Sequence, residues 1–182
     1  MIRINLVARV AGDKNSFPDL VNFAHLLKKQ GMADFLLTFI GAIEDNDIYE
    51  NAIRIAKQLE VTDHIAFTKK SIPMDQLSEE LRSGYFLNFT VGSFMGYSSI
   101  DSVNLDFKTI FCNCDGSLSD EQYPYINFCH DLNEVIELLL LIRKDTVAVD
   151  KQILANNRLM KQSFRLSGTD ASLLKSLMSP NG

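Results

Sequence analysis

Short apolar runs alternate with segments of helical periodicity along almost all of the 182 residues, and this alternation constrains the fold more than any other feature. Apolar runs rich in β-branched and aromatic residues predict strands at residues 4–10, 35–41, 64–67, 85–90, 109–113 and 125–128. Apolar residues at helical spacing predict helices between these runs, at 45–59, 73–81, 97–105 and from 132 onward. The alternation therefore predicts a Rossmann-like three-layer α/β/α domain with a mainly parallel sheet of about six strands.

Local signals mark where several of these elements begin and end. Ser16 is expected to cap a first helix that has Pro18 in its first turn and ends at Gly31. The C-terminal helical segment is expected to break around Asp145 and Gly168, and residues 115–124 to form the longest loop. We expect residues 1–182 to be one domain that includes C-terminal helices from about 145 to 182.

Composition excludes several classes of protein. The chain has 18 basic and 23 acidic residues, a net charge of -5 and no basic run, which argues against sequence-independent nucleic-acid binding. Its three cysteines cannot all pair and no spacing resembles a zinc site, so we expect no metal and buried thiols in a reducing compartment. No secretory signal is present, and the longest apolar run, 135–142, is interrupted by Glu137 and too short for a membrane span. A cytoplasmic location is therefore expected.

Candidate ligand-binding residues follow the predicted strands, because ligands of open parallel sheets bind beyond the carboxyl ends of the strands. Basic residues or glycines, and one serine-containing helix start, occupy these positions: Arg9, Lys14, Gly41, Lys69, Lys70, Gly96, Tyr97, Ser98 and Ser99. Glycine permits close backbone approach, and the first N–H groups of a helix bind anions. The pattern favours a phosphate ligand. The alternative is a set of solvated loops with an ordinary helix cap, in which Arg9 pairs with an acid such as Asp13.

Several short motifs occur in an order typical of one enzyme family. They are Ala8-Arg9-Val10 with Lys14, Phe39-Ile40-Gly41, residues 59–67 followed by Thr68, Ser93-Phe94-Met95-Gly96-Tyr97-Ser98, residues 107–111 and residues 131–135. Over nearly its whole length the chain resembles the C-terminal, donor-binding domain of GT-B glycosyltransferases of the group 1, family 4 type.

The resemblance implies a function and a set of roles. It implies a hexosyltransferase-type enzyme that transfers a sugar from a nucleoside-diphosphate sugar to a glycan or lipid-linked acceptor, in polysaccharide or cell-envelope biosynthesis. Arg9 and Lys14 would clamp the donor diphosphate, and no cofactor or metal would be needed. An N-terminal acceptor-binding domain, absent from these residues, would complete the enzyme, so the isolated domain would transfer little. A peripheral position at the inner membrane face is compatible with such an acceptor.

The sequence departs from the family at its paired glutamates. The first falls on Met95, and the second falls on Val103, or on Ser102 if one residue is deleted, whereas Asp101 and Asp106 are close but not aligned. Because these acids serve the sugar and the ribose in the family, one alternative is a degenerate, non-catalytic GT-B domain that acts as a scaffold. Another is an unrelated Rossmann-like domain for a different phosphate ligand, although no G-x-G-x-x-G follows the first strand.

Overall fold

The structure is a computed structural model that describes residues 1–12, 16–90, 96–113 and 125–163. Its elements, in chain order, are β1 (Ile2–Val7), α1 (Phe17–Lys29), β2 (Phe35–Ile40), α2 (Asn46–Gln58), η1 (Thr62–His64), β3 (Ile65–Phe67), η2 (Met74–Gln76), α3 (Glu79–Arg82), β4 (Tyr85–Thr90), α4 (Tyr97–Asn104), β5 (Lys108–Asn113), β6 (Phe128–Cys129), α5 (Leu132–Lys144) and α6 (Thr146–Ser163).

The strands form one six-stranded sheet in the order β3-β2-β1-β4-β5-β6, and every neighbouring pair is parallel. The chain builds the sheet outward from β1 to β3, then returns to the other side of β1 and continues from β4 to β6. The predicted fold class, a Rossmann-like α/β domain with about six parallel strands, is confirmed.

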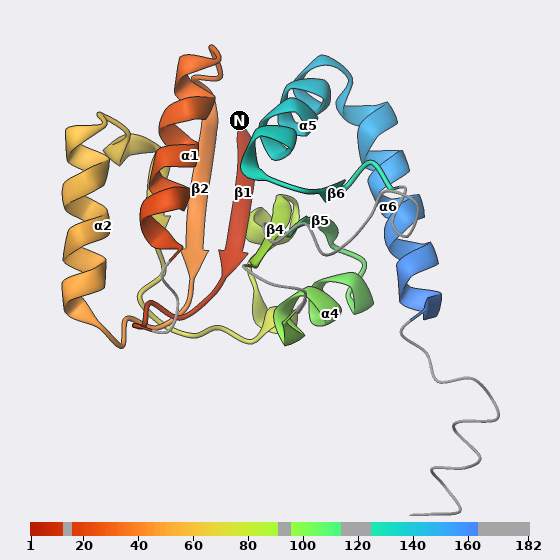
Figure 1. Cartoon of the computed structure of the whole chain (residues 1–182). Helices are drawn as coiled ribbons and strands as arrows, with labels where there is room; N and C mark the ends of the chain where they lie inside the picture. Colours follow the sequence, from red (N-terminus) through yellow and green to blue (C-terminus); the bar gives the residue numbers. More distant parts are fainter. Residues whose placement is uncertain (13–15, 91–95, 114–124, 164–182) are drawn as a thin grey trace, which may run out of the picture.

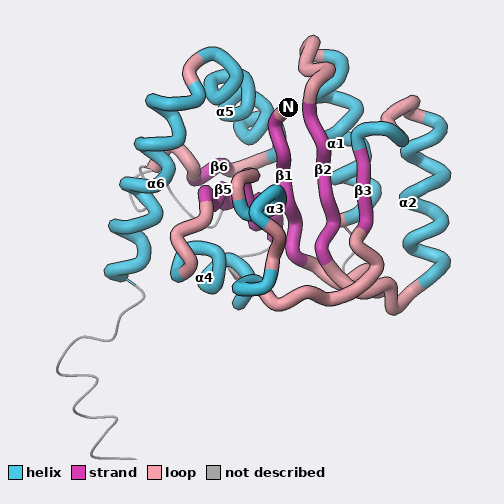
Figure 2. Tube along the Cα trace, turned by 180° about the vertical axis from the view of Figure 1, so that it is seen from behind, coloured by secondary structure: helices cyan, strands magenta, loops and turns pink. Residues whose placement is uncertain are grey.

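Helices cover both faces of the sheet. Helices α1, α2 and α5 lie on one face (Figure 1), and α3 and α4 lie on the other (Figure 2). The larger hydrophobic cluster includes Phe17, Leu37 and Leu139, whereas a second cluster joins Phe86 and Phe107 on the opposite face. Apolar strands buried on both faces explain the continuous hydrophobic runs in the sequence.

Three sequence predictions of secondary structure are wrong in detail. The first strand spans Ile2–Val7 rather than residues 4–10, so residues 8–10 belong to the loop after β1. Residues 73–81 do not form one helix, because Leu77 is extended and the Ser78 hydroxyl accepts from the Leu81 N–H, which starts the separate helix α3. The last strand is shorter and later than 125–128, because Phe128 N–H donates to the Tyr125 carbonyl in a turn and only Phe128 and Cys129 pair with β5.

The remaining predicted boundaries agree with the structure to within one or two residues or lie outside the described residues. Ser16 occupies the N-cap of α1, although its side chain makes no capping hydrogen bond. Asp145 separates α5 from α6 and accepts a hydrogen bond from Ala148 N–H. The predicted break at Gly168 and the predicted loop 115–124 lie outside the described residues.

Polar contacts fix α6 against the sheet. Asp150 on α6 accepts from the Tyr85 hydroxyl at 2.5 Å and lies 3.0 Å from Lys108 Nζ. The buried Asn157 amide donates to the Phe107 carbonyl and accepts from Asn127. Within the part of the chain that the structure describes, no helix is both long and apolar enough to cross a membrane.

Candidate functional site

The sheet has one place where the direction of chain connection reverses, between β1 and β4. The connections after the two strands leave toward opposite faces there, so the carboxyl ends of β1 and β4 flank an opening that neither connection fills. Open α/β sheets bind their ligands at such a switch point.

A pocket of about 120 Å³ lies at this position. Its lining comes from the ends of β1 and β4, the first residues of α1 and α4, and Phe39 of β2: Leu6, Val7, Ala8, Ser16, Phe17, Leu20, Phe39, Leu87, Asn88, Phe89, Thr90, Gly96 and Ser98. We call it the switch-point pocket. Both α1 and α4 begin here, so the positive ends of two helix dipoles meet at a lining that carries no charged side chain among the described residues.

Four polar side chains, those of Ser16, Asn88, Thr90 and Ser98, line the switch-point pocket. The hydroxyl of Ser16, the amide of Asn88 and the hydroxyl of Ser98 make no hydrogen bond to the rest of the described chain. Gly96, with a φ of +30°, leads the backbone into α4 beside them. Asn88 was missed in the sequence analysis, although an amide inside the otherwise apolar run 85–90 was the signal that could have found it.

Two of the candidate residues at the start of α4, Ser99 and Tyr97, do not line the switch-point pocket. The Ser99 side chain is 2% exposed and its hydroxyl donates to the Gly96 carbonyl at 2.7 Å, so it stabilises the helix start from within. Tyr97, by contrast, is 81% exposed at the same helix start. Of the four predicted residues here, Gly96 and Ser98 line the pocket and Tyr97 and Ser99 flank it.

Arg9 lies in the loop that follows β1 and is half exposed. Its Nη1 is 2.5 Å from Glu44 Oε2, in the loop after β2. The Val10 carbonyl accepts from the N–H groups of Glu44 and Asp45, which fixes the two loops side by side. The ion pair expected as an alternative for Arg9 thus involves Glu44, whereas Asp13 and Lys14 lie outside the described residues.

Gly41 has a packing reason for being glycine. A Cβ at this position would lie 2.1 Å from the Ala8 carbonyl oxygen, far inside van der Waals contact. Its N–H donates to Thr68 Oγ1 at 3.1 Å, and the Thr68 hydroxyl donates to the Lys70 carbonyl. Gly41 therefore joins the loops after three neighbouring strands, and no ligand is needed to explain it.

The two lysines after β3 lie apart from the pocket lining. Lys69 has a φ of +58°, and its Nζ lies 5.0 Å from the centre of the Tyr49 ring on α2. Lys70 is exposed in the same loop. Because β3 is separated from β1 by β2, the structure does not bring these two cations to the switch-point pocket.

The positions aligned with the second family glutamate face the core. Val103 is 0% exposed, and Ser102 is 1% exposed with its hydroxyl 2.8 Å from Thr109 Oγ1 on β5. Asp101 is exposed on α4, and Asp106 pairs with Lys161. The first aligned position, Met95, lies outside the described residues.

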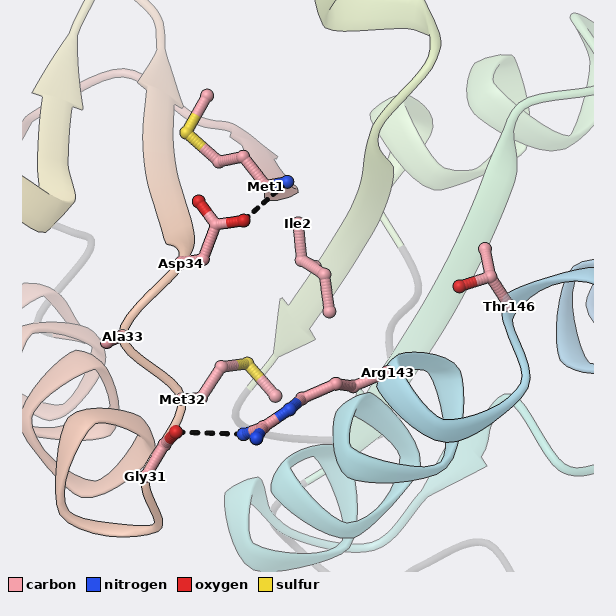
Figure 3. A pocket seen from close by; sticks show the side chains of 8 residues that line it. All are labelled: Met1, Ile2, Gly31, Met32, Ala33, Asp34, Arg143 and Thr146. Atoms are coloured by element: carbon pink, nitrogen blue, oxygen red, sulfur yellow. Dashed lines mark hydrogen bonds and ion pairs between the residues drawn. The ribbon is translucent and has the colours of Figure 1, made fainter.

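A larger cavity, of about 390 Å³, lies at the opposite edge of the sheet. Figure 3 shows Arg143 reaching across it toward the Gly31 carbonyl, to which it donates at 2.8 Å, while Asp34 pairs with the Met1 ammonium. This edge holds the amino ends of the strands and the C-terminus of α1, where the helix dipole repels anions. Its polar groups are already paired, so we do not assign the ligand site there.

The groups whose pKa is strongly shifted lie away from the switch-point pocket. Burial, reinforced by the hydrogen bond and charge of Asp150, raises the pKa of Tyr85 at the start of β4. Burial, with a further contribution from Glu134, raises the pKa of Cys129 on β6 to about 12. Among the described residues, no cluster of three or more His, Cys, Asp or Glu side chains is arranged to hold a metal ion. The pocket's described chemistry is thus that of neutral polar groups and helix ends.

The fold of the chain is shared with solved glycosyltransferase structures. The C-terminal domain of a glycosyl transferase group 1 family protein from Francisella tularensis matches with a TM-score of 0.65 and 12% identity, over 91% of this chain and 87% of that domain. A glycosyltransferase from Rickettsia africae matches with a TM-score of 0.69 and 13% identity, over 99% of this chain and 49% of that one. An Anabaena protein in complex with UDP and glucose matches with a TM-score of 0.70 and 11% identity, over 98% of this chain and 48% of that one.

These likenesses define the fold of the chain. It is the Rossmann-like fold of the C-terminal domain of GT-B glycosyltransferases, as the sequence resemblance implied. The chain spans about half the length of the Rickettsia and Anabaena proteins. No protein-family model and no curated protein matches the sequence.

Proposed function

We propose that the chain is the donor-binding domain of a glycosyltransferase and that it holds a nucleoside-diphosphate sugar at the switch-point pocket. The observation that carries the proposal is the pocket itself, at the reversal of strand order and between the N-termini of α1 and α4. The Anabaena structure, which contains UDP and glucose, has the same fold and supports this choice of ligand.

The size and chemistry of the pocket suit the phosphates of such a donor. Pockets that enclose a whole drug-sized ligand have about 300–1,000 Å³, whereas this one has about 120 Å³. It therefore fits a diphosphate better than a complete nucleotide. Helix N-termini stabilise phosphate oxygens, and Arg9 at the same edge can stabilise the charge that develops on the departing nucleoside diphosphate.

The finer elements of the proposal follow from the family resemblance. Lys14 is proposed as a further contact to the donor diphosphate, and a separate N-terminal domain is proposed to bind the acceptor. The acceptor is proposed to be a glycan or a lipid-linked sugar of a polysaccharide or cell-envelope pathway. A cytoplasmic enzyme at the inner membrane face, working without cofactor or metal, would fit such an acceptor.

Calorimetric titration tests the proposal directly. The chain should bind UDP or GDP, and it should bind flavin mononucleotide and nicotinamide dinucleotides less tightly. Ser98→Asp, which places a like charge at the proposed phosphate site, should abolish binding, and Asn22→Asp on the exposed face of α1 is the matched control. Binding of flavin alone, or equal binding by wild type and Ser98→Asp, would contradict the proposal.

One observation favours a second candidate, a GT-B domain that binds but does not catalyse. Ser102 and Val103, the positions of the second family glutamate, are buried between α4 and β5, so no carboxylate reaches the ligand from there. A protein that includes the N-terminal domain should then bind donor without releasing nucleoside diphosphate. Turnover of a nucleotide-sugar panel by that longer protein would exclude the scaffold.

A further inference from the structure

One polar atom in the centre of the sheet lacks a hydrogen-bond partner. Asn5 of β1 is 0% exposed, and its Nδ2 donates to the Leu81 carbonyl at 2.7 Å. Because a carbonyl only accepts, this contact fixes the orientation of the amide and leaves Oδ1 on the other side. Within the described residues, Asn5 Oδ1 is a buried side-chain atom with no partner. Leaving such an acceptor unpaired is unfavourable, so a donor is expected beside it.

A narrow cleft beside Asn5 lies between the sheet and α4. It is lined by residues of β1, β4 and α4: Asn5, Val7, Phe86, Leu87, Asn88, Ser98, Ser99 and Ser102. Four of these, Val7, Leu87, Asn88 and Ser98, also line the switch-point pocket. The cleft therefore continues from the back wall of that pocket into the core beneath α4.

The cleft contains further hydrogen-bonding groups that the chain itself does not use. The Asn88 amide and the Ser98 hydroxyl make no hydrogen bond to the described chain, and both can donate as well as accept. Three unused polar side chains on three different elements thus line one small space. Asn88 and Ser98 are partly buried and Asn5 is fully buried, so a dry cleft would leave the Asn5 oxygen with neither hydration nor a partner.

We propose that one ordered water molecule occupies this cleft, donates a hydrogen bond to Asn5 Oδ1, and bonds to Asn88 or Ser98. The cavity volume of about 10 Å³ matches the minimum that holds a single water and excludes a phosphate, a sugar hydroxymethyl group or a hydrated ion. Buried waters make about three hydrogen bonds each, which is the number of unused side chains here. The water links β1 to the first turn of α4.

This water gives the Ser98 hydroxyl or the Asn88 amide a fixed partner behind the switch-point pocket. Their remaining hydrogen-bonding capacity then faces the pocket, where a ligand is expected. The water site itself does not depend on which ligand the pocket takes, so it can be tested on the free chain.

A crystal structure of the ligand-free chain at about 1.5 Å resolution is the direct test. A water peak is expected about 2.7–3.0 Å from Asn5 Oδ1 and within hydrogen-bond distance of Asn88 or Ser98. No density there, or a protein donor bonded to Oδ1 instead, would overturn the proposal. Failure of nucleotide titration with the water present would contradict the proposed function alone.

A pair of variants at Asn88 tests the same site in solution. Leucine is larger than asparagine and should expel the water and leave Asn5 Oδ1 unpaired, raising the unfolding equilibrium constant about five- to hundred-fold. Alanine leaves room for water, so Asn88→Ala should change the constant less than Asn88→Leu. A dry cleft predicts the reverse order, because leucine would then add apolar contacts and alanine would remove them. Asn22→Leu, on the exposed surface of α1, controls for the residue change.

Discussion

The ion pair between Arg9 and Glu44 changes how strongly Arg9 should contribute to ligand binding. A guanidinium–phosphate hydrogen bond stabilises a complex by about 1.5–3 kcal/mol, so sequence alone predicts roughly ten- to hundred-fold weaker nucleoside diphosphate binding for Arg9→Ala. In the structure Arg9 is 2.5 Å from Glu44 Oε2, and both side chains are 48% exposed. An exposed pair of this kind contributes about 0–1 kcal/mol, and a phosphate has to replace it.

The expected magnitudes follow by difference. Arg9→Ala should weaken binding of UDP or GDP by about 1–2 kcal/mol, roughly five- to thirty-fold. Glu44→Gln should strengthen binding by up to about five-fold, because it weakens one restraint on the guanidinium and removes a like charge beside the phosphate. In the Glu44→Gln background, Arg9→Ala should cost the full ten- to hundred-fold. Lys14→Ala should cost less than Arg9→Ala, because an ammonium is a hydrated point charge.

Isothermal titration of the wild type, Arg9→Ala, Glu44→Gln and the double variant gives the coupling energy between the Arg9 and Glu44 side chains. Lys28→Ala is the matched control, since Lys28 is an exposed cation on α1 whose ammonium donates to the Glu60 carbonyl. Circular dichroism establishes that each variant is folded. Binding by Arg9→Ala that equals binding by Lys28→Ala would place the phosphate elsewhere. Equal losses for Arg9→Ala in both backgrounds would show that Glu44 does not restrain Arg9.

Three predictions concern stability. Gly41→Ala should destabilise the fold by about 3 kcal/mol or more in urea denaturation, since its Cβ would lie 2.1 Å from a backbone oxygen. Gly31→Ala, with no atom within 4 Å of its Cβ, should cost about 1–2 kcal/mol from its positive φ alone. Equal losses of stability in the two variants would refute the packing argument. Burial raises the pKa of Cys129 to about 12, so the folded chain keeps a proton that the unfolded chain releases above about pH 8.5. Stability should therefore fall from about pH 9 to 12, by up to about 1.4 kcal/mol per pH unit, and Cys129→Val should lose that share of the slope. Asp150→Ala should lower the free energy of unfolding by about 1–3 kcal/mol, because Lys108 loses its partner; an unchanged thermal midpoint would contradict this.

The sequence predicted those features that depend on residues close together in the chain. The strand run 85–90 was predicted with the bounds that the structure gives, because Tyr85, Phe86, Leu87 and Phe89 leave a strong aromatic and apolar signal. The helix predicted at 73–81 failed because Ser78 caps a new helix there, and its hydroxyl competed with the continuing periodicity.

Features that depend on long-range packing were not readable from the sequence. The partner of Arg9 is Glu44, 35 residues away, and only the parallel pairing of neighbouring loops brings them together. Gly41 stays a predicted ligand contact, but its packing reason for being glycine, the Ala8 carbonyl in the loop after β1, depends on the pairing of β1 with β2. The sequence does not distinguish Asn5 from other polar residues in strands. The burial of its unpartnered oxygen depends on the packing of α4 against β1 and β4.

The chemistry of the switch-point pocket separates holding a donor from activating it. The neutral hydroxyl of Ser98 and amide of Asn88 respond less than a full positive charge to a gain of charge on the ligand, and uniform binding lowers KM without raising kcat. Acceleration needs an interaction that strengthens as the leaving diphosphate gains charge, and a guanidinium now shared with Glu44 responds in that way. In the longer protein with its N-terminal domain, Arg9→Ala should therefore lower kcat by a larger factor than it raises KM, whereas Ser98→Ala should mainly raise KM. Steady-state kinetics with a nucleotide sugar measure both factors. A rise in KM at unchanged kcat for Arg9→Ala would assign Arg9 to holding the donor and leave its activation to residues of the other domain.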